Sequence, residues 1–516
     1  MANPAIEKLI GSLDNDLPRS ALYQKKTPAL AEAFDAGRMK QTLQDTLLGP
    51  VAGRYAIAKC VPAKALYLLD HTINMQFKLE ILDSTNNETI ATLVNAQLFQ
   101  DAATCRAFLQ KSLIPVAARM DGRPEIQPFA RPVAIVEHLN MSLSVYPIDG
   151  LIPTLVDATD PSKVASLLEA TMPEALSGTF SMQQVHQFLA HYGRYKRCVL
   201  RYSIDGVQTE TQTPQQATVY GKVDADGSGG VTVDIISALI ERLSEPDLLY
   251  RFRIPRSLGY FPDLQLLLME ALPGKPFFKD LLKTWTGNSH RSGNETTSPD
   301  NYITMEQAVR TCALIAATLH GSNIKLGPQT TLEIQVDSLM EETNVFCEVF
   351  PEVGSQVKSW INQTVEFAQA YPAMPLCFSH GDFTHTQLIF DGNQGGLVDF
   401  DSVCQAEPAQ DVGHYLAYLR LNIIKGQDPN APFAPEAIES LCTLFLDTYI
   451  DLSKSWIPDE KLLRGRVAIY ELISLIRLAL HSWQKMKGSR LKQTLTLLDE
   501  RFESQKQINL SVNRTP

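Results

Sequence analysis

Two short segments near residue 390 carry the side chains best suited to chemistry. Residues 379–387 read SHGDFTHTQ, and residues 397–401 read LVDFD. Asp382 is followed five residues later by the amide of Gln387 and, twelve residues after that, by Asp399. Phosphoryl transfer from a nucleotide needs a proton acceptor and oxygen ligands for magnesium. The spacing therefore predicts Asp382 as the proton acceptor and Gln387 and Asp399 as the ligands.

A predicted β-hairpin connects the two segments. Residues 388–390 and 397–398 are apolar, and the intervening Asp-Gly and Gly-Gly pairs are typical of hairpin turns. A hairpin brings the loop that holds Asp382 and the strand end that holds Asp399 to the same edge. A His-Gly-Asp tripeptide alone is common in turns, so the prediction depends on this hairpin.

The elements that must position these residues fall into two patterns. From residue 407 onward, apolar residues recur every three or four positions, which predicts helices, two of them over residues 461–487 and 491–502. Before them, β-rich runs at 198–204 and 217–223, a helix over 231–243, and β-rich runs at 256–260 and 264–270 predict a small α+β lobe. Residues 269–274 then run into a Pro-Gly turn, which predicts a hinge between the lobes.

The N-terminal region is a third unit. Apolar runs at 64–69 and 75–82 and a helical pattern over 102–113 predict a mixed α+β region. Residues 141–150 loosely resemble 266–274, so one interpretation is a degenerate copy of the small lobe. The predicted boundaries are 1–180 for this region, 181–272 for the small lobe and 273–516 for the helical lobe. The polar run 286–299 is predicted to be a flexible surface loop inserted in the helical lobe.

Composition excludes several classes of function. The 516-residue chain has a formal net charge of −11 and no Lys/Arg-rich block, which argues against nucleic acid as its main partner. Its acidic balance is compatible with a cationic substrate. The eight cysteines show no Cys-x-x-Cys pair, and Glu471 and Arg477 interrupt the longest apolar stretch. We found no secretory signal, and so we expect a cytoplasmic protein that binds no membrane.

The motifs resemble the aminoglycoside phosphotransferase and choline kinase family. The resemblance rests on residues 380–382 with an amide five positions after Asp382, on residues 398–401, and on residues 407–411 (EPAQD), and it covers roughly 185–485. It implies a two-lobed, protein-kinase-like α+β fold, with the N-terminal α+β region as an addition. It also implies that Asp382 is the catalytic base, that Gln387 and Asp399 bind magnesium, and that Asp411 braces the catalytic loop.

Two features of the site differ from the family or stay open. The family usually has asparagine where this chain has Gln387, so we expect a shifted backbone or a bridging water there. Asp411 is explained equally well as an aspartate in the first turn of a helix. His320, at the end of a predicted helix, is expected to be structural, and His385 lies inside the catalytic loop.

The resemblance also implies a nucleotide-binding lysine in the small lobe, oriented by a helix glutamate. Lys222 precedes the predicted helix that carries Glu241, and Arg201 is the rival cation. Glu270, at the hinge, completes the predicted nucleotide-binding residues. The nearest counterpart of a glycine-rich loop is residues 192–197, which contain one glycine and three cations.

The leading hypothesis is a kinase that uses ATP and Mg²⁺ to phosphorylate a hydroxyl of a small metabolite or antibiotic-like acceptor. A pseudokinase that binds nucleotide or a partner is the main alternative, because of Gln387 and the glycine-poor loop. A metal-dependent hydrolase that uses the same carboxylates is a third hypothesis, which predicts no role for Lys222.

Overall fold

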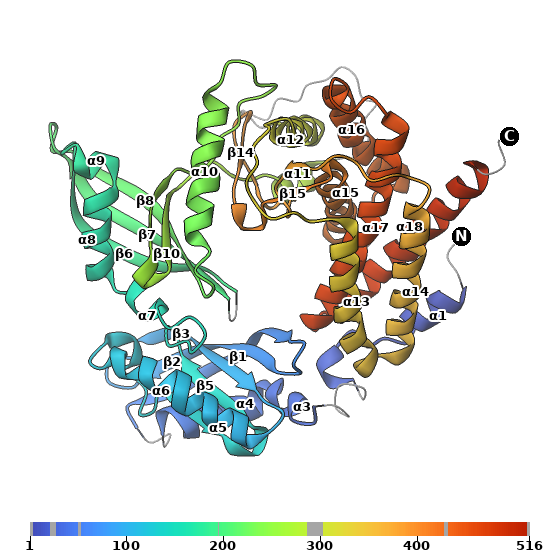
Figure 1. Cartoon of the computed structure of the whole chain (residues 1–516). Helices are drawn as coiled ribbons and strands as arrows, with labels where there is room; N and C mark the ends of the chain where they lie inside the picture. Colours follow the sequence, from blue (N-terminus) through green and yellow to red (C-terminus); the bar gives the residue numbers. More distant parts are fainter. Residues whose placement is uncertain are drawn as a thin grey trace.

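The computed structural model describes residues 4–20, 27–49, 53–193, 196–285, 303–427 and 432–512. It contains an N-terminal sheet region, a second sheet and a large helical part (Figure 1). The predicted surface loop at 286–299 lies outside the described residues, as do Arg194 and Tyr195 of the basic segment 192–197.

The N-terminal region is built on a five-stranded antiparallel sheet of order β1-β2-β3-β5-β4. Short helices precede the sheet, and one helical segment lies between its third and fourth strands. The elements are α1 (Pro4–Gly11), α3 (Ala29–Ala33), α4 (Ala36–Leu43), β1 (Tyr55–Tyr67), β2 (Ile73–Asp83), β3 (Thr89–Leu98), α5 (Ala102–Phe108), α6 (Ile114–Ala117), β4 (Val133–Val136) and β5 (Met141–Val145).

The second sheet forms the small lobe, again antiparallel, with the order β6-β7-β8-β10-β9. Alternate residues of its strands pack on α8, whereas the opposite face carries Lys222. The elements, with the connecting helices, are α7 (Leu155–Ala158), α8 (Pro161–Thr171), α9 (Pro173–Leu176), β6 (Phe180–Tyr192), β7 (Arg197–Gln208), β8 (Pro214–Asp224), α10 (Gly229–Ser244), β9 (Ser257–Phe261) and β10 (Leu266–Glu270). The predicted order of strand, strand, helix, strand, strand is confirmed, with β6 added in front.

The two sheets share more than their strand order. In each, the main helical segment lies between the third and fourth strands, and a short 3₁₀ turn ends in a left-handed residue just before the last strand, Asn140 in one and Gln265 in the other. Counted from those residues, the registers correspond: Lys222 lies opposite Leu267, and Gln97 lies opposite Ser142.

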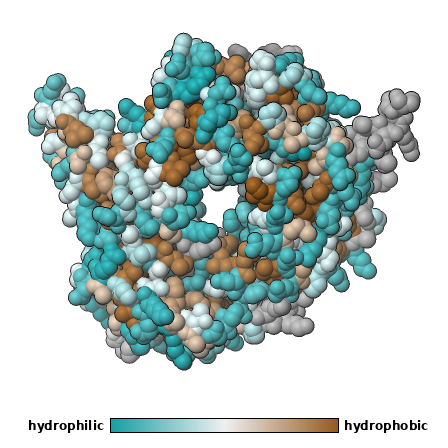
Figure 2. Space-filling model, in the orientation of Figure 1, coloured by the Kyte–Doolittle hydropathy of each residue, from teal (hydrophilic) through white to brown (hydrophobic). Residues whose placement is uncertain are grey.

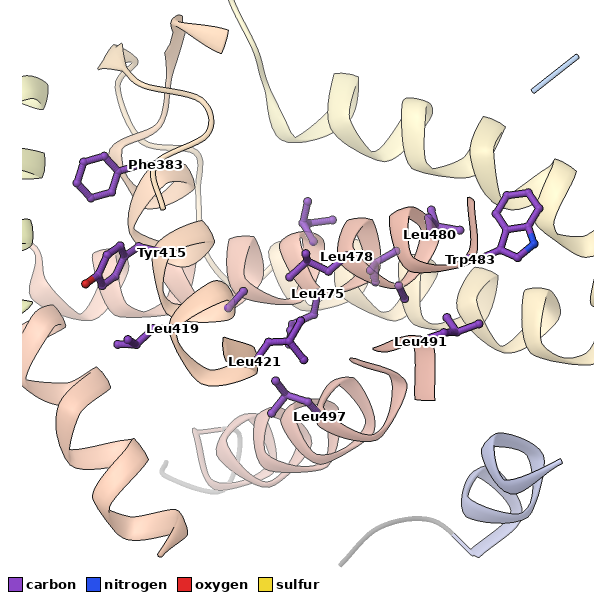
Figure 3. Close-up of a cluster of buried hydrophobic side chains, with 14 of the residues drawn as sticks. Phe383, Tyr415, Leu419, Leu421, Leu475, Leu478, Leu480, Trp483, Leu491 and Leu497 are labelled. Carbon is purple, nitrogen blue, oxygen red and sulfur yellow. The ribbon is translucent and has the colours of Figure 1, made fainter. Parts of the chain in front are cut away.

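The helical lobe packs two long C-terminal helices against the rest of its core. Figure 3 shows leucines of α17 and α18 meeting, with Phe383 and Tyr415 at one end of the cluster. The predicted helices at 461–487 and 491–502 are confirmed, and α18 is longer than predicted. The elements are β11 (Lys275–Pro276), α11 (Phe278–Thr284), α12 (Met305–His320), α13 (Leu332–Val349), α14 (Pro351–Ala368), β12 (Cys377–Ser379), β13 (Leu388–Asp391), β14 (Gln394–Leu397), β15 (Cys404–Ala406), α15 (Pro408–Gly426), α16 (Pro435–Ser453), α17 (Glu460–Gln484) and α18 (Gly488–Val512).

The N-terminal region contacts both other parts. Lys64 donates from Nζ to the backbone oxygen of Tyr192 in the small lobe at 3.1 Å, and the ring of Tyr67 lies 5.4 Å from that of Trp483 on α17. Figure 2 shows the resulting opening through the centre of the molecule. In the part of the chain that the structure describes, we find no helix that could span a membrane.

Candidate active site

The predicted catalytic loop follows β12. Asp411, in the first turn of α15, holds the backbone of this loop through hydrogen bonds. The Asp411 carboxylate accepts hydrogen bonds from the backbone N–H groups of His380, at 2.6 Å, and Gly381, at 2.9 Å. His320 donates to the same carboxylate at 3.2 Å and also hydrogen-bonds Tyr449. Asp411 is fully buried, so these donors supply the partners that its charge needs. The contacts are those expected of a residue that braces the loop.

Local backbone geometry explains the glycine before Asp382. Gly381 has a φ of +79°, and a Cβ there would lie 2.0 Å from the backbone oxygen of Ser402. Only glycine, which has no Cβ, fits so close to the backbone at Ser402 in this conformation. On the other side of Asp382, Phe383 is buried, and its ring centroid lies 5.7 Å from that of Tyr415. Figure 3 shows the two side chains near each other. The loop is thus anchored on both sides of its aspartate.

Both carboxylate oxygens of Asp382 accept hydrogen bonds. His414 of α15 donates to Oδ1 at 3.1 Å, and the Gln387 amide donates to Oδ2 at 3.0 Å. Burial raises the pKa of Asp382, but the hydrogen bond and charge of His414 and the other donors outweigh it and lower the pKa to about 2. The side chain is still 37% exposed. An ionised carboxylate therefore faces space that a substrate can enter.

The predicted hairpin is confirmed and brings Gln387 and Asp399 together. Leu388 pairs with Leu397, and the turn is tighter than predicted, only Gly392-Asn393. The Gln387 amide reaches Asp382 directly and lies 3.3 Å from Asp399 Oδ2. The extra methylene of glutamine therefore does not keep its amide out of the site.

The donor set at Gln387 and Asp399 fits magnesium in chemical type, but in this structure the Gln387 amide directs its nitrogen at the carboxylates and would have to turn its oxygen toward an ion. An amide oxygen and a carboxylate that is 35% exposed are hard oxygen donors, and Mg²⁺ in such sites takes one or two carboxylates together with phosphate oxygens. Burial raises the pKa of Asp399, but Lys222 and Arg197 outweigh it and lower the pKa, so this carboxylate is ionised. Among the residues that the structure describes, no three His, Cys, Asp or Glu side chains form a metal site by themselves. The proposed ion would therefore depend on nucleotide oxygens.

Lys222 joins the two lobes. It is buried on β8, and its Nζ donates to Asp399 Oδ1 at 2.9 Å and forms an ion pair with Asp401. Burial lowers the pKa of Lys222, and the charge of Asp399 only partly offsets this effect. Arg197, at the start of β7, also pairs with Asp401 and donates to Asp224 at 2.6 Å. Two cations of the small lobe thus converge on the Asp-Phe-Asp segment.

Three other residues predicted to bind the nucleotide do not contact Asp399 or Asp401. Glu241 is exposed on α10, and the partners found for Lys222 are the two aspartates instead. Arg201 shares the sheet face of Lys222 but is exposed and stacks on Phe188 at 4.8 Å. Glu270 is on the face that packs toward α8, opposite to Lys222, where it accepts a hydrogen bond from Arg256 at 2.8 Å.

Sequence reasoning missed His414 and did not single out Arg197. His414 follows Asp411 by three residues, so one turn of α15 places both side chains under the catalytic loop. That spacing was the available signal. Arg197 is one of the three cations in the basic segment 192–197, and its selection required the position of Asp401. His385 is buried against Phe278, and burial lowers its pKa to about 4.

Comparisons with known proteins confirm the resemblance read from the motifs. Residues 251–430 match the model of the phosphotransferase enzyme family, APH. This segment contains the hinge, the catalytic loop, the hairpin and Asp411, but not Lys222. No curated protein sequence matches the chain.

The solved structures most similar to this chain include small-molecule kinases. One is a GDP complex of an aminoglycoside 2′-phosphotransferase IIIa mutant, with 14% identity, a TM-score of 0.41, and coverage of 67% of this chain and 98% of that chain. Another is a choline/ethanolamine kinase family protein from Mesorhizobium loti, with 14% identity, a TM-score of 0.40, and coverage of 66% and 95%. A third is a Plasmodium vivax ethanolamine kinase, with 13% identity, a TM-score of 0.40, and coverage of 66% and 89%.

Proposed function

We propose that the chain is a kinase that transfers the γ-phosphoryl group of ATP, with Mg²⁺, to a hydroxyl of a small molecule. The observation that carries the proposal is the meeting of Lys222 with Asp399 and Asp401 across the lobes, next to the ionised and partly exposed Asp382. The match of residues 251–430 to a phosphotransferase family supports the same reaction class.

The residues have distinct roles in this proposal. Lys222 and Arg197 meet nucleotide phosphates, and Gln387 and Asp399 hold Mg²⁺, which neutralises phosphate charge when it is bound. The acceptor oxygen attacks the γ-phosphorus, the bond from that phosphorus to the β–γ bridging oxygen breaks, and ADP leaves. The hydroxyl proton passes to Asp382, which His414 keeps oriented.

We also propose that the protein works in a reducing compartment such as the cytoplasm. All eight cysteines are free thiols, and six of them are buried. Disulfides are rare where glutathione keeps thiols reduced, and free buried cysteines are common there.

The experiment is an untargeted search for phosphorylated products. Purified protein is incubated with ATP, Mg²⁺ and a small-molecule extract, and new phosphate esters are sought by mass spectrometry. We expect at least one ester with the wild-type protein and a rate about 10²–10⁴-fold lower with Asp382→Asn, which cannot accept the proton. Binding of ATP without any ester would indicate the pseudokinase instead.

A further inference from the structure

The face of α17 next to the catalytic base carries polar residues that the mechanism above does not use. Ser474 hydrogen-bonds Nδ1 of His414 at 3.1 Å, and the same histidine holds Asp382. Arg477 and His481 follow Ser474 by three and seven residues, so they lie on the same face of the helix. This face therefore extends from the base along one wall of the site.

Arg477 has no carboxylate partner among the described residues. Its Nη2 donates to the neutral side chain of Gln335 at 2.8 Å, and no carboxylate of the described residues lies within 4 Å of it. Two other buried arginines of this lobe are each paired: Arg466 with Glu407 at 2.7 Å and Arg420 with Glu471 at 2.8 Å. Arg477 therefore differs from these two fully buried arginines, because it has no carboxylate partner in the part of the chain that the structure describes.

Neighbouring charges do not compensate for Arg477. Glu342 and Asp382 act on it only at longer range, and Glu342 accepts a hydrogen bond from Gln484 at 3.3 Å. Arg490 lies against the hydroxyl of Tyr418, whose pKa is raised to about 12 by burial and by Asp382. Burial lowers the pKa of His481 to about 3, with help from Lys485, Arg477 and Arg490, so this ring is neutral. The wall carries more cations than anions.

Burial of an unpaired charge is costly, and buried cations are normally paired or meet a ligand. A guanidinium matches carboxylate and phosphate groups through two parallel N–H donors. We propose that the acceptor is an alcohol that carries an anionic group, a carboxylate or a phosphate, and that Arg477, with Arg490 beside it, binds this group. The inference rests on the proposed kinase function and names its substrate class.

The local charge of the site thus points away from the cationic acceptors that the overall charge of −11 is compatible with. The net charge is a sum over the whole chain, whereas Arg477 is close enough to Asp382 for the two charges to act on each other. A protonated amine in the place of the anionic group would be repelled by both guanidinium groups, although Glu342 and Asp382, the two carboxylates that act on Arg477, would attract it.

The test measures binding of four hexoses that differ in one group: glucose, glucosamine, glucuronate and glucose 6-phosphate. Isothermal titration is done at fixed ionic strength with a non-hydrolysable ATP analogue and Mg²⁺ at saturation, so that anions cannot occupy the nucleotide site. The variants are R477Q, which keeps a donor to Gln335, R477K, which keeps the charge, and the control R38Q, an exposed arginine of α4.

We expect glucuronate, glucose 6-phosphate or both to bind about tenfold more tightly than glucose and glucosamine. R477Q should remove this preference, R477K should restore part of it, and R38Q should leave it unchanged; which anion binds better tells carboxylate from phosphate. Equal binding of all four, no measurable binding, or tightest binding of glucosamine would overturn the inference. An unchanged affinity of R477Q for the ATP analogue shows that this variant is folded. Failure of the wild-type protein to bind the analogue would overturn the kinase proposal instead.

Discussion

At the scale of single residues, the pKa of Asp382 depends on its partners. Burial alone would raise that pKa, and the low value of about 2 results from His414 and the other donors. The His-Gly-Asp motif identifies Asp382 as a candidate base from the sequence alone. It does not show His414 as a partner, because that contact depends on where α15 passes under the loop.

The His414→Ala variant should move the acidic limb of the pH–rate profile upward by about one unit or more. Activity needs ionised Asp382, and removal of the donor leaves burial as the main influence on its pKa. The limb should then lie above its wild-type position, and His414→Gln, which can still donate, should reverse part of the shift. A profile identical to that of the wild type would contradict this role.

The Lys222→Met variant should weaken nucleotide binding about tenfold or more, because a charge-assisted contact to phosphate is lost. Arg201→Met is the matched control, a cation on the same sheet face that stacks on Phe188 instead of meeting Asp399. Titration with an ATP analogue and Mg²⁺ gives both affinities. If only Arg201→Met weakens binding, Arg201 is the nucleotide-binding cation. The hydrolase hypothesis predicts full activity in Lys222→Met.

At the scale of elements, the hairpin and the strand order of the small lobe could be predicted because they depend on local patterns. The glycine-containing turn at Gly392 and the alternation in β7 and β8 are visible in the sequence. The pairing of Glu241 with Lys222 was assigned from chain order, and the structure places Glu241 on the exposed face of α10. Which face of a helix meets the site is decided by packing between distant segments, which chain order does not contain.

A buried carboxylate, Glu471, joins three of the C-terminal helices through ion pairs. Glu471 of α17 accepts hydrogen bonds from Arg420 of α15 at 2.8 Å and Arg501 of α18 at 3.0 Å. Burial raises the pKa of Glu471, but the two arginines outweigh it and leave the pKa below its usual value. The contribution of this carboxylate to stability is therefore present above about pH 4.5 and is lost as the pH falls toward the folded-state pKa.

The Glu471→Gln variant should lower the free energy of unfolding at pH 7 by about 3–5 kcal/mol, because the buried Arg420 and the partly exposed Arg501 lose their buried carboxylate and keep only the exposed Glu439. The difference from the wild type should shrink as the pH falls from 5 to 3. Chemical denaturation across this range measures both effects. A difference that is constant with pH would show that ionisation of Glu471 contributes nothing.

At the scale of the whole molecule, we propose that the N-terminal region is a degenerate copy of the small lobe. The shared strand order, the helical segment in the same place and the left-handed residue before each last strand support this proposal. The register places Gln97 where the small lobe has Lys222. The sequence shows only the short resemblance of residues 141–150 to 266–274. In this proposal the side chains of the two copies have diverged more than the order of their strands.

A copy without the lysine should bind no nucleotide. Titration with an ATP analogue and Mg²⁺ should therefore give one site per chain, and Lys222→Met should weaken that single event. A second site that persists in Lys222→Met would contradict this account of the N-terminal region.

The most direct test of the central claim follows the oxygen atoms of the γ-phosphoryl group. The protein is incubated with Mg²⁺, the acceptor found in the extract search, and ATP labelled with ¹⁸O on its three terminal γ-oxygens. The mass of the product is then measured by mass spectrometry. A kinase gives a phosphate ester that retains all three labelled oxygens, and Asp382→Asn forms it far more slowly. If the label instead appears in inorganic phosphate that carries one oxygen from water, with no ester formed, the chain is a hydrolase and the account is wrong.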